Sequence, residues 1–150
     1  MRNMLNAGLV VVGLGLAGGG CMRGSMPTTV LDKPRCESGT MVGQRVYVEV
    51  DYASGAGLNN HDAKPETCKV KSGAQITWIA SREDAANPFQ LRFKQGSPDA
   101  SGTKEITSKP GTSGRQEVTI TTVRVTERAE YPYWIYANGS GVDPTIIIEP

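Results

Sequence analysis

Three cysteines and one histidine are the side chains of this 150-residue chain best suited to covalent or metal chemistry. Cys21 follows a run of glycines, whereas Cys36 and Cys68 lie in the polar part of the chain. His61 stands beside Asp62 in the polar stretch NNHDAKPE. A tight metal site needs several ligands, and no cluster of His or Asp flanks Cys36 or Cys68. We therefore predict no metal centre, with His61 and Asp62 as the candidates should one exist.

Catalysis finds little support in the sequence. There is no Gly-x-Ser-x-Gly nucleophile motif, and Glu83 and Asp84 form the only adjacent acidic pair. The single histidine has no nucleophile close to it in the sequence. The 16 Lys and Arg nearly balance the 15 Asp and Glu, whereas binding to phosphates calls for a basic surface. We predict a protein that is not an enzyme, carries no cofactor and does not bind nucleic acid.

Residues 1–20 predict an export signal and not a part of the fold. Arg2 gives a positive start, an apolar run follows, and small residues precede Cys21. The run is too short to span a membrane. The ending LAGGGC resembles the cleavage box of bacterial lipoproteins, with Gly18 where Leu is usual. The resemblance implies that Cys21 becomes the lipidated first residue. Ordinary cleavage, giving a soluble periplasmic protein, is the alternative.

The same resemblance implies a location. Acyl chains on Cys21 would hold the protein on a membrane, because more than one chain makes anchoring stable. Met22 stands where an Asp would signal retention, which implies sorting to the periplasmic face of the outer membrane. Residues 21–34, with Pro27 and Pro34 and no periodicity, predict a flexible tether. Residues 35–150 are then the folded domain.

With Cys21 assigned to lipid, Cys36 and Cys68 remain in an oxidising compartment. We therefore predict that they form one disulfide. Closing that loop would add roughly 3 to 4 kcal/mol through chain entropy.

Short alternating runs predict an all-β fold. Val46, Val48 and Val50 share one face of the first run, as period-2 alternation requires of a half-buried strand. Residues 81–87 fit either one helical turn or a loop, and no other stretch suggests a helix. We expect seven or eight strands in a Greek-key β-sandwich of two packed sheets. The strands are predicted over residues 41–52, 67–70, 74–80, 88–94, 103–107, 116–126, 131–137 and 145–149.

Three patterns resemble the cupredoxin fold of blue copper proteins: PETCKVKSGAQITW, PFQLRF and YPYWIYANGSGVDPTIII. The resemblance implies that the two imidazole, one thiolate and one thioether ligands of such a centre fall at Phe89, Asn138, Ile135 and Asp143. Phe and Ile offer no ligating atom. The resemblance therefore implies a cupredoxin-like domain without copper, in which hydrocarbon fills the metal pocket.

The closing aromatic segment is the candidate partner-binding region. Alternation places Tyr131, Tyr133 and Ile135 on one face, and Trp134 and Tyr136 on the other. We expect these two outward aromatics to anchor a partner. The residues of this candidate region are Trp134, Tyr136, Tyr47, which joins the outward set, and Asp143 in the bend over 138–143. The alternatives are that both faces are buried, and that the bend is only a tight turn needing positive φ at Gly.

These features predict a bacterial envelope lipoprotein that presents a copper-free cupredoxin-like interaction domain to the periplasm. Its partner would be another envelope protein, as for an inhibitor or immunity protein. The alternative is a periplasmic metal- or small-molecule-binding protein with a site unlike a copper centre, using His61, Asp62 and Asp143. A redox protein is a third interpretation.

Overall fold

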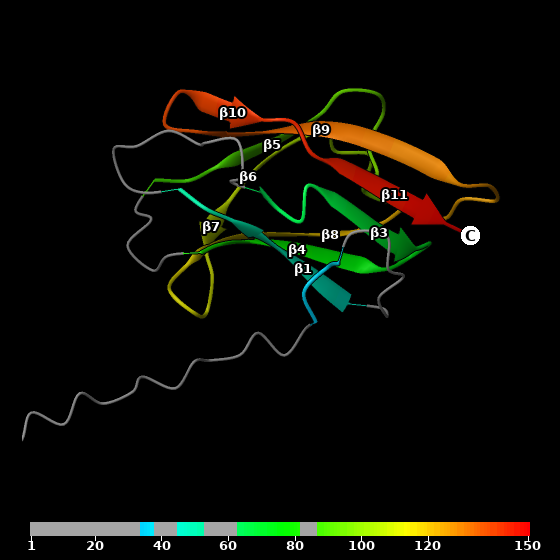
Figure 1. The fold of residues 1–150 in the computed structure, drawn as a ribbon, viewed down its shortest axis with the longest axis horizontal. Helices are drawn as coiled ribbons and strands as arrows, with labels where there is room; N and C mark the ends of the chain where they lie inside the picture. The colour runs from blue at the N-terminus through cyan, green and yellow to red at the C-terminus, as the bar shows by residue number, and fades with distance from the viewer. Residues whose placement is uncertain (1–33, 38–44, 53–62, 82–86) are drawn as a thin grey trace, which may run out of the picture.

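The computed structural model describes residues 34–37, 45–52, 63–81 and 87–150, and every regular element within them is a β-strand (Figure 1). Cys21, His61 and Asp62 lie outside the described residues, as do most of the predicted tether and of the segment 81–87. The described residues contain no helix with the length and apolar character needed to cross a bilayer.

The first sheet has the strand order β2-β1-β4-β8-β7. Its β1 and β4 run parallel, whereas the other neighbours are antiparallel. In chain order its strands are β1 (Arg45–Val50), β2 (Ala63–Lys64), β4 (Gln75–Ala80), β7 (Lys109–Pro110) and β8 (Gln116–Thr121).

The second sheet has the order β3-β11-β9-β5-β6, and β10 pairs with β9 as well. Here β3 and β11 run parallel and the remaining pairs are antiparallel. Its strands are β3 (Thr67–Lys71), β5 (Gln90–Phe93), β6 (Glu105–Thr107), β9 (Ala129–Ala137), β10 (Ser140–Val142) and β11 (Thr145–Glu149).

The two sheets enclose one hydrophobic core. Val48 of β1 and Trp78 of β4 are buried in it from one sheet, and Leu91 of β5 and Ile135 of β9 from the other. The chain passes between the sheets after β2, β3, β4, β6 and β8, which gives the crossing connections of a Greek-key sandwich. The predicted all-β sandwich is confirmed.

Each of the eight predicted strands has a counterpart, and β2, β7 and β10 are additional. These three span only two or three residues, too few for an alternating pattern to show in the sequence. The strand predicted over 116–126 ends at Thr121 instead. Beyond it the Val125 amide donates to Ser72 Oγ at 2.8 Å, so the chain leaves the ladder. Val123 and Val125 still pack against the core, which explains the continuing apolar pattern.

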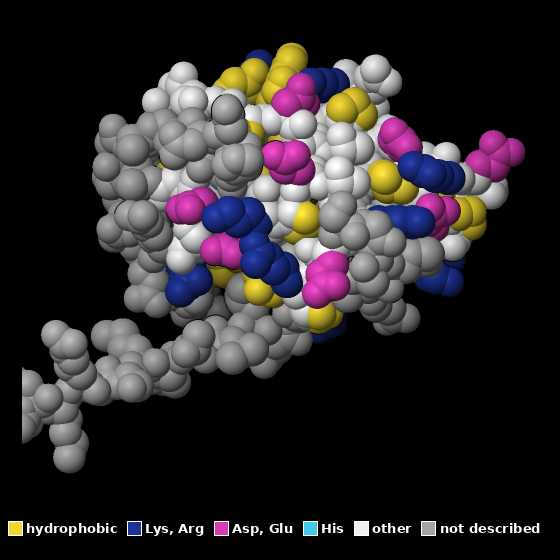
Figure 2. Space-filling model, in the orientation of Figure 1, with side chains coloured by type: hydrophobic (Ala, Val, Ile, Leu, Met, Phe, Trp, Pro, Cys, Tyr) yellow, Lys and Arg dark blue, Asp and Glu magenta, His cyan; other side chains and the backbone are white. Residues whose placement is uncertain are grey.

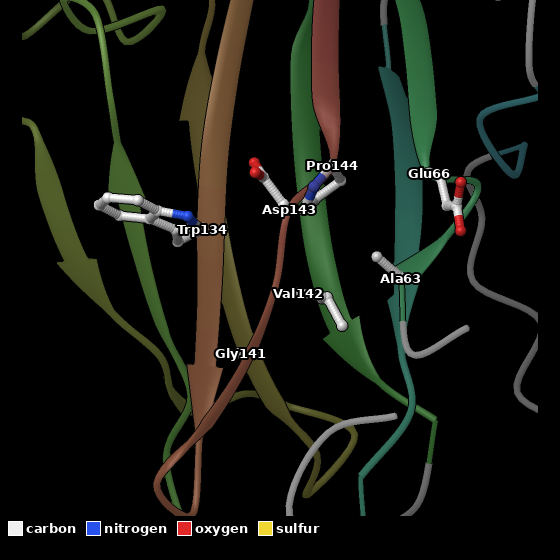
Figure 3. A pocket seen from close by; sticks show the side chains of 7 residues that line it. All are labelled: Ala63, Glu66, Trp134, Gly141, Val142, Asp143 and Pro144. Atoms are coloured by element: carbon white, nitrogen blue, oxygen red, sulfur yellow. The ribbon is translucent and has the colours of Figure 1, made fainter. Parts of the chain in front are cut away.

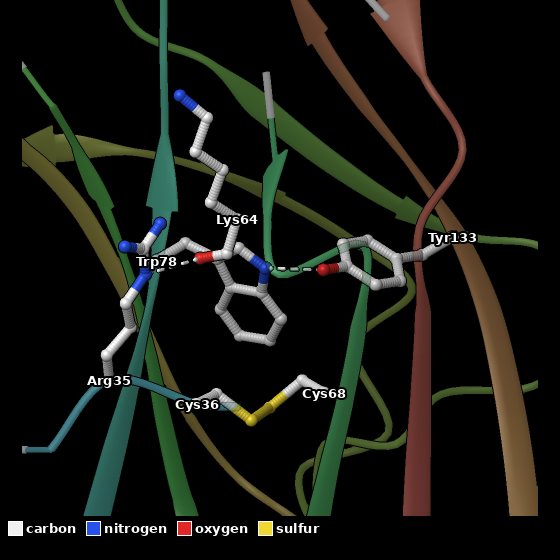
Figure 4. Close-up of a disulfide and its surroundings, with 6 residues drawn as sticks. All are labelled: Arg35, Cys36, Lys64, Cys68, Trp78 and Tyr133. Atoms are coloured by element: carbon white, nitrogen blue, oxygen red, sulfur yellow. Dashed lines mark hydrogen bonds between the residues drawn. A yellow bond between two sulfur atoms is a disulfide. The ribbon is translucent and has the colours of Figure 1, made fainter. Parts of the chain in front are cut away.

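The predicted disulfide between Cys36 and Cys68 is confirmed, with a Cα–Cα distance of 5.5 Å (Figure 4). The Cys36 amide donates to the Tyr47 carbonyl at 2.7 Å, which places Cys36 beside β1 of the first sheet. Cys68 belongs to β3 of the second sheet. The bond therefore joins the start of the domain to both layers.

Replacing both cysteines, as Cys36→Ser with Cys68→Ser, should lower the free energy of unfolding by roughly 3 to 4 kcal/mol, because the loop is no longer closed in the unfolded chain. Urea unfolding followed by fluorescence measures the change. Wild-type protein unfolded under reducing conditions is the control and should match the variant. An unchanged unfolding midpoint would show that the disulfide does not stabilise the domain.

Candidate partner-binding site

Strand β9 divides its side chains between the core and the outer face of the second sheet. Tyr133 and Ile135 are fully buried, whereas Trp134 and Tyr136 are half-exposed. The Trp134 and Tyr136 rings lie 5.9 Å apart between centroids, tilted by 60°. The expected alternation is thus present, and its outward members form a contiguous aromatic pair.

Two cations from β5 and its end lie against this pair. The Lys94 ammonium is 4.7 Å from the centre of the Trp134 ring, and the Arg92 guanidinium carbon is 5.6 Å from that of Tyr136. Both distances lie within the range of a cation–π interaction. The register between β5 and β9 brings the cations next to the rings, because Arg92 pairs with Trp134. We call Arg92, Lys94, Trp134 and Tyr136 the cation–aromatic patch.

Each cation of the patch also has an acidic partner. Lys94 Nζ forms an ion pair with Asp143 Oδ2, and Arg92 Nε lies 2.8 Å from Glu105 Oε1. Figure 2 shows the same mixture of Lys and Arg beside Asp and Glu over the face in view. With its charges paired in this way, the patch suits short-range contact better than long-range attraction of one sign of charge.

A groove of about 400 Å³ adjoins the patch and shares Trp134 with it. Trp134 lies on one side of the groove and Ala63 and Glu66 on the other, with segment 141–144 between them (Figure 3). Glu66 and Asp143 are exposed, and the remaining lining is mostly apolar. Its lining residues are Ala63, Glu66, Trp134, Gly141, Val142, Asp143 and Pro144. We call this hollow the Trp134 groove.

A tight turn shapes one wall of the groove. Asn138 and Gly139 have φ values of 50° and 80°, as in the two-residue hairpin turn that favours Asn-Gly. The predicted positive φ at glycine is therefore present. The chain then returns along β9 as β10, which the sequence analysis did not predict although Asn-Gly is a hairpin signal. Gly141 faces Tyr136, and a Cβ on Gly141 would lie 3.0 Å from the Tyr136 ring.

The structure brings together three of the four predicted partner-binding residues. Trp134 and Tyr136 form the aromatic pair, and Asp143 joins them through Lys94. Tyr47 belongs to β1 of the first sheet, so the expectation that it joins this outward set is wrong. Sequence reasoning missed Arg92 and Lys94. Their alternation with Leu91 and Phe93 was visible, but only the pairing with β9 shows what they contact.

The positions that the cupredoxin resemblance assigned to copper ligands do not form one polar cluster. Phe89 and Ile135 are fully buried in the core, where Leu91 pairs directly with Ile135. Asn138 is exposed in the turn, where its Oδ1 accepts a bond from the Asn87 amide at 2.9 Å. Within the described ranges no three His, Cys, Asp or Glu side chains are grouped so that they could hold a metal ion.

Comparisons with known proteins return structural neighbours but no family. No protein-family model matches the chain, and no curated protein matches it in sequence. Reduced rusticyanin is 20% identical with a TM-score of 0.39, covering 75% of this chain and 86% of that one. Rusticyanin from Thiobacillus ferrooxidans is 18% identical with a TM-score of 0.37, covering 71% and 79%. At this level of similarity we draw no functional conclusion from them.

Replacing Lys94 with Ala should expose the Trp134 ring at small cost to stability. The residue's ion pair and cation–π contact lie at the surface, so the expected loss is below about 1 kcal/mol. Quenching of tryptophan fluorescence by neutral acrylamide should increase, because Trp134 is half-exposed while Trp78 is fully buried. Lys109→Ala on the other sheet is the matched control. Equal quenching in both variants would show that Lys94 does not shield the ring.

Proposed function

We propose that this protein is an exported, membrane-anchored binding module that recognises another protein of the bacterial envelope. The contact surface is the cation–aromatic patch together with the Trp134 groove. The observation that carries the proposal is the aromatic pair of Trp134 and Tyr136, held outward on strand β9. Aromatic side chains at the centre of a patch typically supply most of the free energy of protein association.

The flanking ion pairs favour recognition by contact. Lys94 with Asp143 and Arg92 with Glu105 hold long side chains in place before a partner arrives. Such preorganisation reduces the entropy lost on binding. Polar pairs around aromatic anchors also match the usual arrangement of an apolar centre within a polar rim.

Export and anchoring complete the proposal. The signal-like start and LAGGGC support lipidation of Cys21, and the disulfide suits an oxidising compartment. Fourteen residues lie between Cys21 and Cys36, so these fifteen steps of the chain reach at most about 54 Å whatever their conformation. The domain would therefore act on partners close to the membrane surface. The periplasmic face of the outer membrane and an inhibitor or immunity type of role are part of this proposal.

A small-molecule-binding role is the second candidate, and the volume of the Trp134 groove favours it. About 400 Å³ falls within the range of small-ligand sites. Native mass spectrometry of the purified domain would separate the two roles. A bound small molecule that is lost in Trp134→Ala supports the second candidate.

Cys21→Ser should release the protein from membranes. Acylation requires the Cys21 thiol, and a serine side chain without acyl chains does not anchor a protein in a bilayer. Fractionation after a carbonate wash measures the distribution, and intact mass measures the acyl groups. The Cys36→Ser and Cys68→Ser double variant should remain bound and serves as the control. Membrane retention of Cys21→Ser would remove the lipid anchor from the proposal.

Trp134→Ala combined with Tyr136→Ala should reduce capture of the partner at least about tenfold, because aromatic anchors dominate such contacts. In-cell photocrosslinking from Gln90, on the same outer face, measures the captured fraction. Tyr47→Ala is the matched control, since Tyr47 is a half-exposed aromatic on the other sheet. A crosslinked product that persists in the double variant, or is lost equally in Tyr47→Ala, would overturn the proposed surface.

A further inference from the structure

Most of the edge strands, which have a neighbour on one side, carry residues that discourage pairing with a further strand. Among the described strands, β2 ends in Lys64, β7 is Lys109–Pro110, β3 carries Lys69 and Lys71, and β6 begins with Glu105. Charges and proline on edge strands prevent unwanted addition of another strand. Strand β10, with the sequence Ser-Gly-Val, has β9 as its one partner among the described strands, and it carries neither charge nor proline. Its edge is the exception among them.

The hydrogen-bonding groups of β10 are oriented for a further strand. In a two-residue hairpin the residues flanking the turn, here Ala137 and Ser140, form the first hydrogen-bonded pair. Hydrogen-bonded and non-hydrogen-bonded pairs then alternate, so Gly141 opposite Tyr136 is non-hydrogen-bonded. The N–H and C=O of Gly141 therefore point away from β9, toward the side on which no described strand pairs with β10. Gly141 also lines the Trp134 groove, so the groove lies along this edge.

The charge of the groove selects among possible occupants. The residues that line it include two exposed carboxylates, those of Glu66 and of Asp143, which is paired with Lys94, and they include no Lys or Arg. The chain's own Lys94 shows what the site accepts, because its ammonium lies over the Trp134 ring and pairs with Asp143. An indole face beside a carboxylate is a favourable setting for a basic side chain.

We propose that β10 is a strand-addition site, and that its occupant is an extended basic segment of the partner protein. This inference rests on the proposed function. The segment's backbone pairs with the N–H and C=O of Gly141, and its Lys or Arg side chains face Glu66 and Asp143. Backbone pairing supplies affinity in this mode of recognition, and alternate side chains supply specificity.

Two capped synthetic peptides test the charge preference: acetyl-Thr-Lys-Val-Lys-Thr-amide and its counterpart with Glu in place of both Lys. In an NMR titration of the domain together with its predicted tether, the basic peptide should shift the resonances of the Gly141 amide and the Trp134 indole N–H. It should bind at least about fivefold more tightly than the acidic peptide, because like charges disfavour the latter. Equal affinities, or shifts confined to another face, would overturn the proposal.

A pair of substitutions at Gly141 tests the backbone contact. Gly141→Ala and Gly141→Pro both place a Cβ against the Tyr136 ring, but only proline removes the N–H. Gly141→Pro should bind the basic peptide about fivefold to tenfold more weakly than Gly141→Ala does, because one hydrogen bond is lost. Equal affinities of the two variants would exclude pairing at Gly141.

Amide hydrogen exchange in the unmodified protein covers the case in which the proline variant fails to fold. Saturating basic peptide should slow exchange of the Gly141 amide, and unchanged exchange contradicts strand addition. The crosslinking experiment remains separate. If the crosslinked product is lost on replacing Trp134 and Tyr136 but persists in Gly141→Pro, the proposed function is retained and this inference is removed. If capture of the partner does not depend on Trp134 and Tyr136, the proposed function itself is removed.

Discussion

The contact between Trp78 and Tyr133 ties the outer surface of this protein to its core. The Trp78 indole N–H donates to the Tyr133 hydroxyl at 2.8 Å, and the rings meet edge to face at 5.6 Å (Figure 4). Trp78 comes from the first sheet and Tyr133 from the second, so the bond spans the sandwich. Burial raises the pKa of Tyr133, which keeps its hydroxyl neutral. A buried N–H without this acceptor would cost about 1 to 3 kcal/mol.

This contact also determines which face of β9 is exposed. Side chains alternate along a strand, so a one-residue shift of register would turn every side chain to the opposite face. With Tyr133 fixed to Trp78, neighbouring Trp134 must lie outward, and so must Tyr136 two residues on. The geometry of the proposed binding surface is thus set by the packing of the core. The disulfide lies in the same region of the core (Figure 4), and it holds the segment after the predicted tether against both sheets.

The sequence predicted those features that repeat over several residues. Alternation in β1, β5 and β9 identified the buried faces, because a half-buried strand imposes period 2 on its side chains. It could not assign Tyr47 and Trp134 to different sheets, since alternation carries no information on which strands are neighbours. For the same reason Arg92 and Lys94 went unnoticed. Their role arises from the pairing of β5 with β9, a contact between residues far apart in the chain.

Strand β9 therefore performs three tasks within nine residues. Its inner face completes the core, its outer face carries the aromatic pair, and its end forms the hairpin that presents β10. The hairpin needs Gly139 for its positive φ, and Gly141 lets the Tyr136 ring lie across the returning strand. A larger residue at 141 would press on Tyr136, whose ring contacts both Trp134 and Arg92. The edge of β10 and the aromatic pair are thus adjacent parts of one surface.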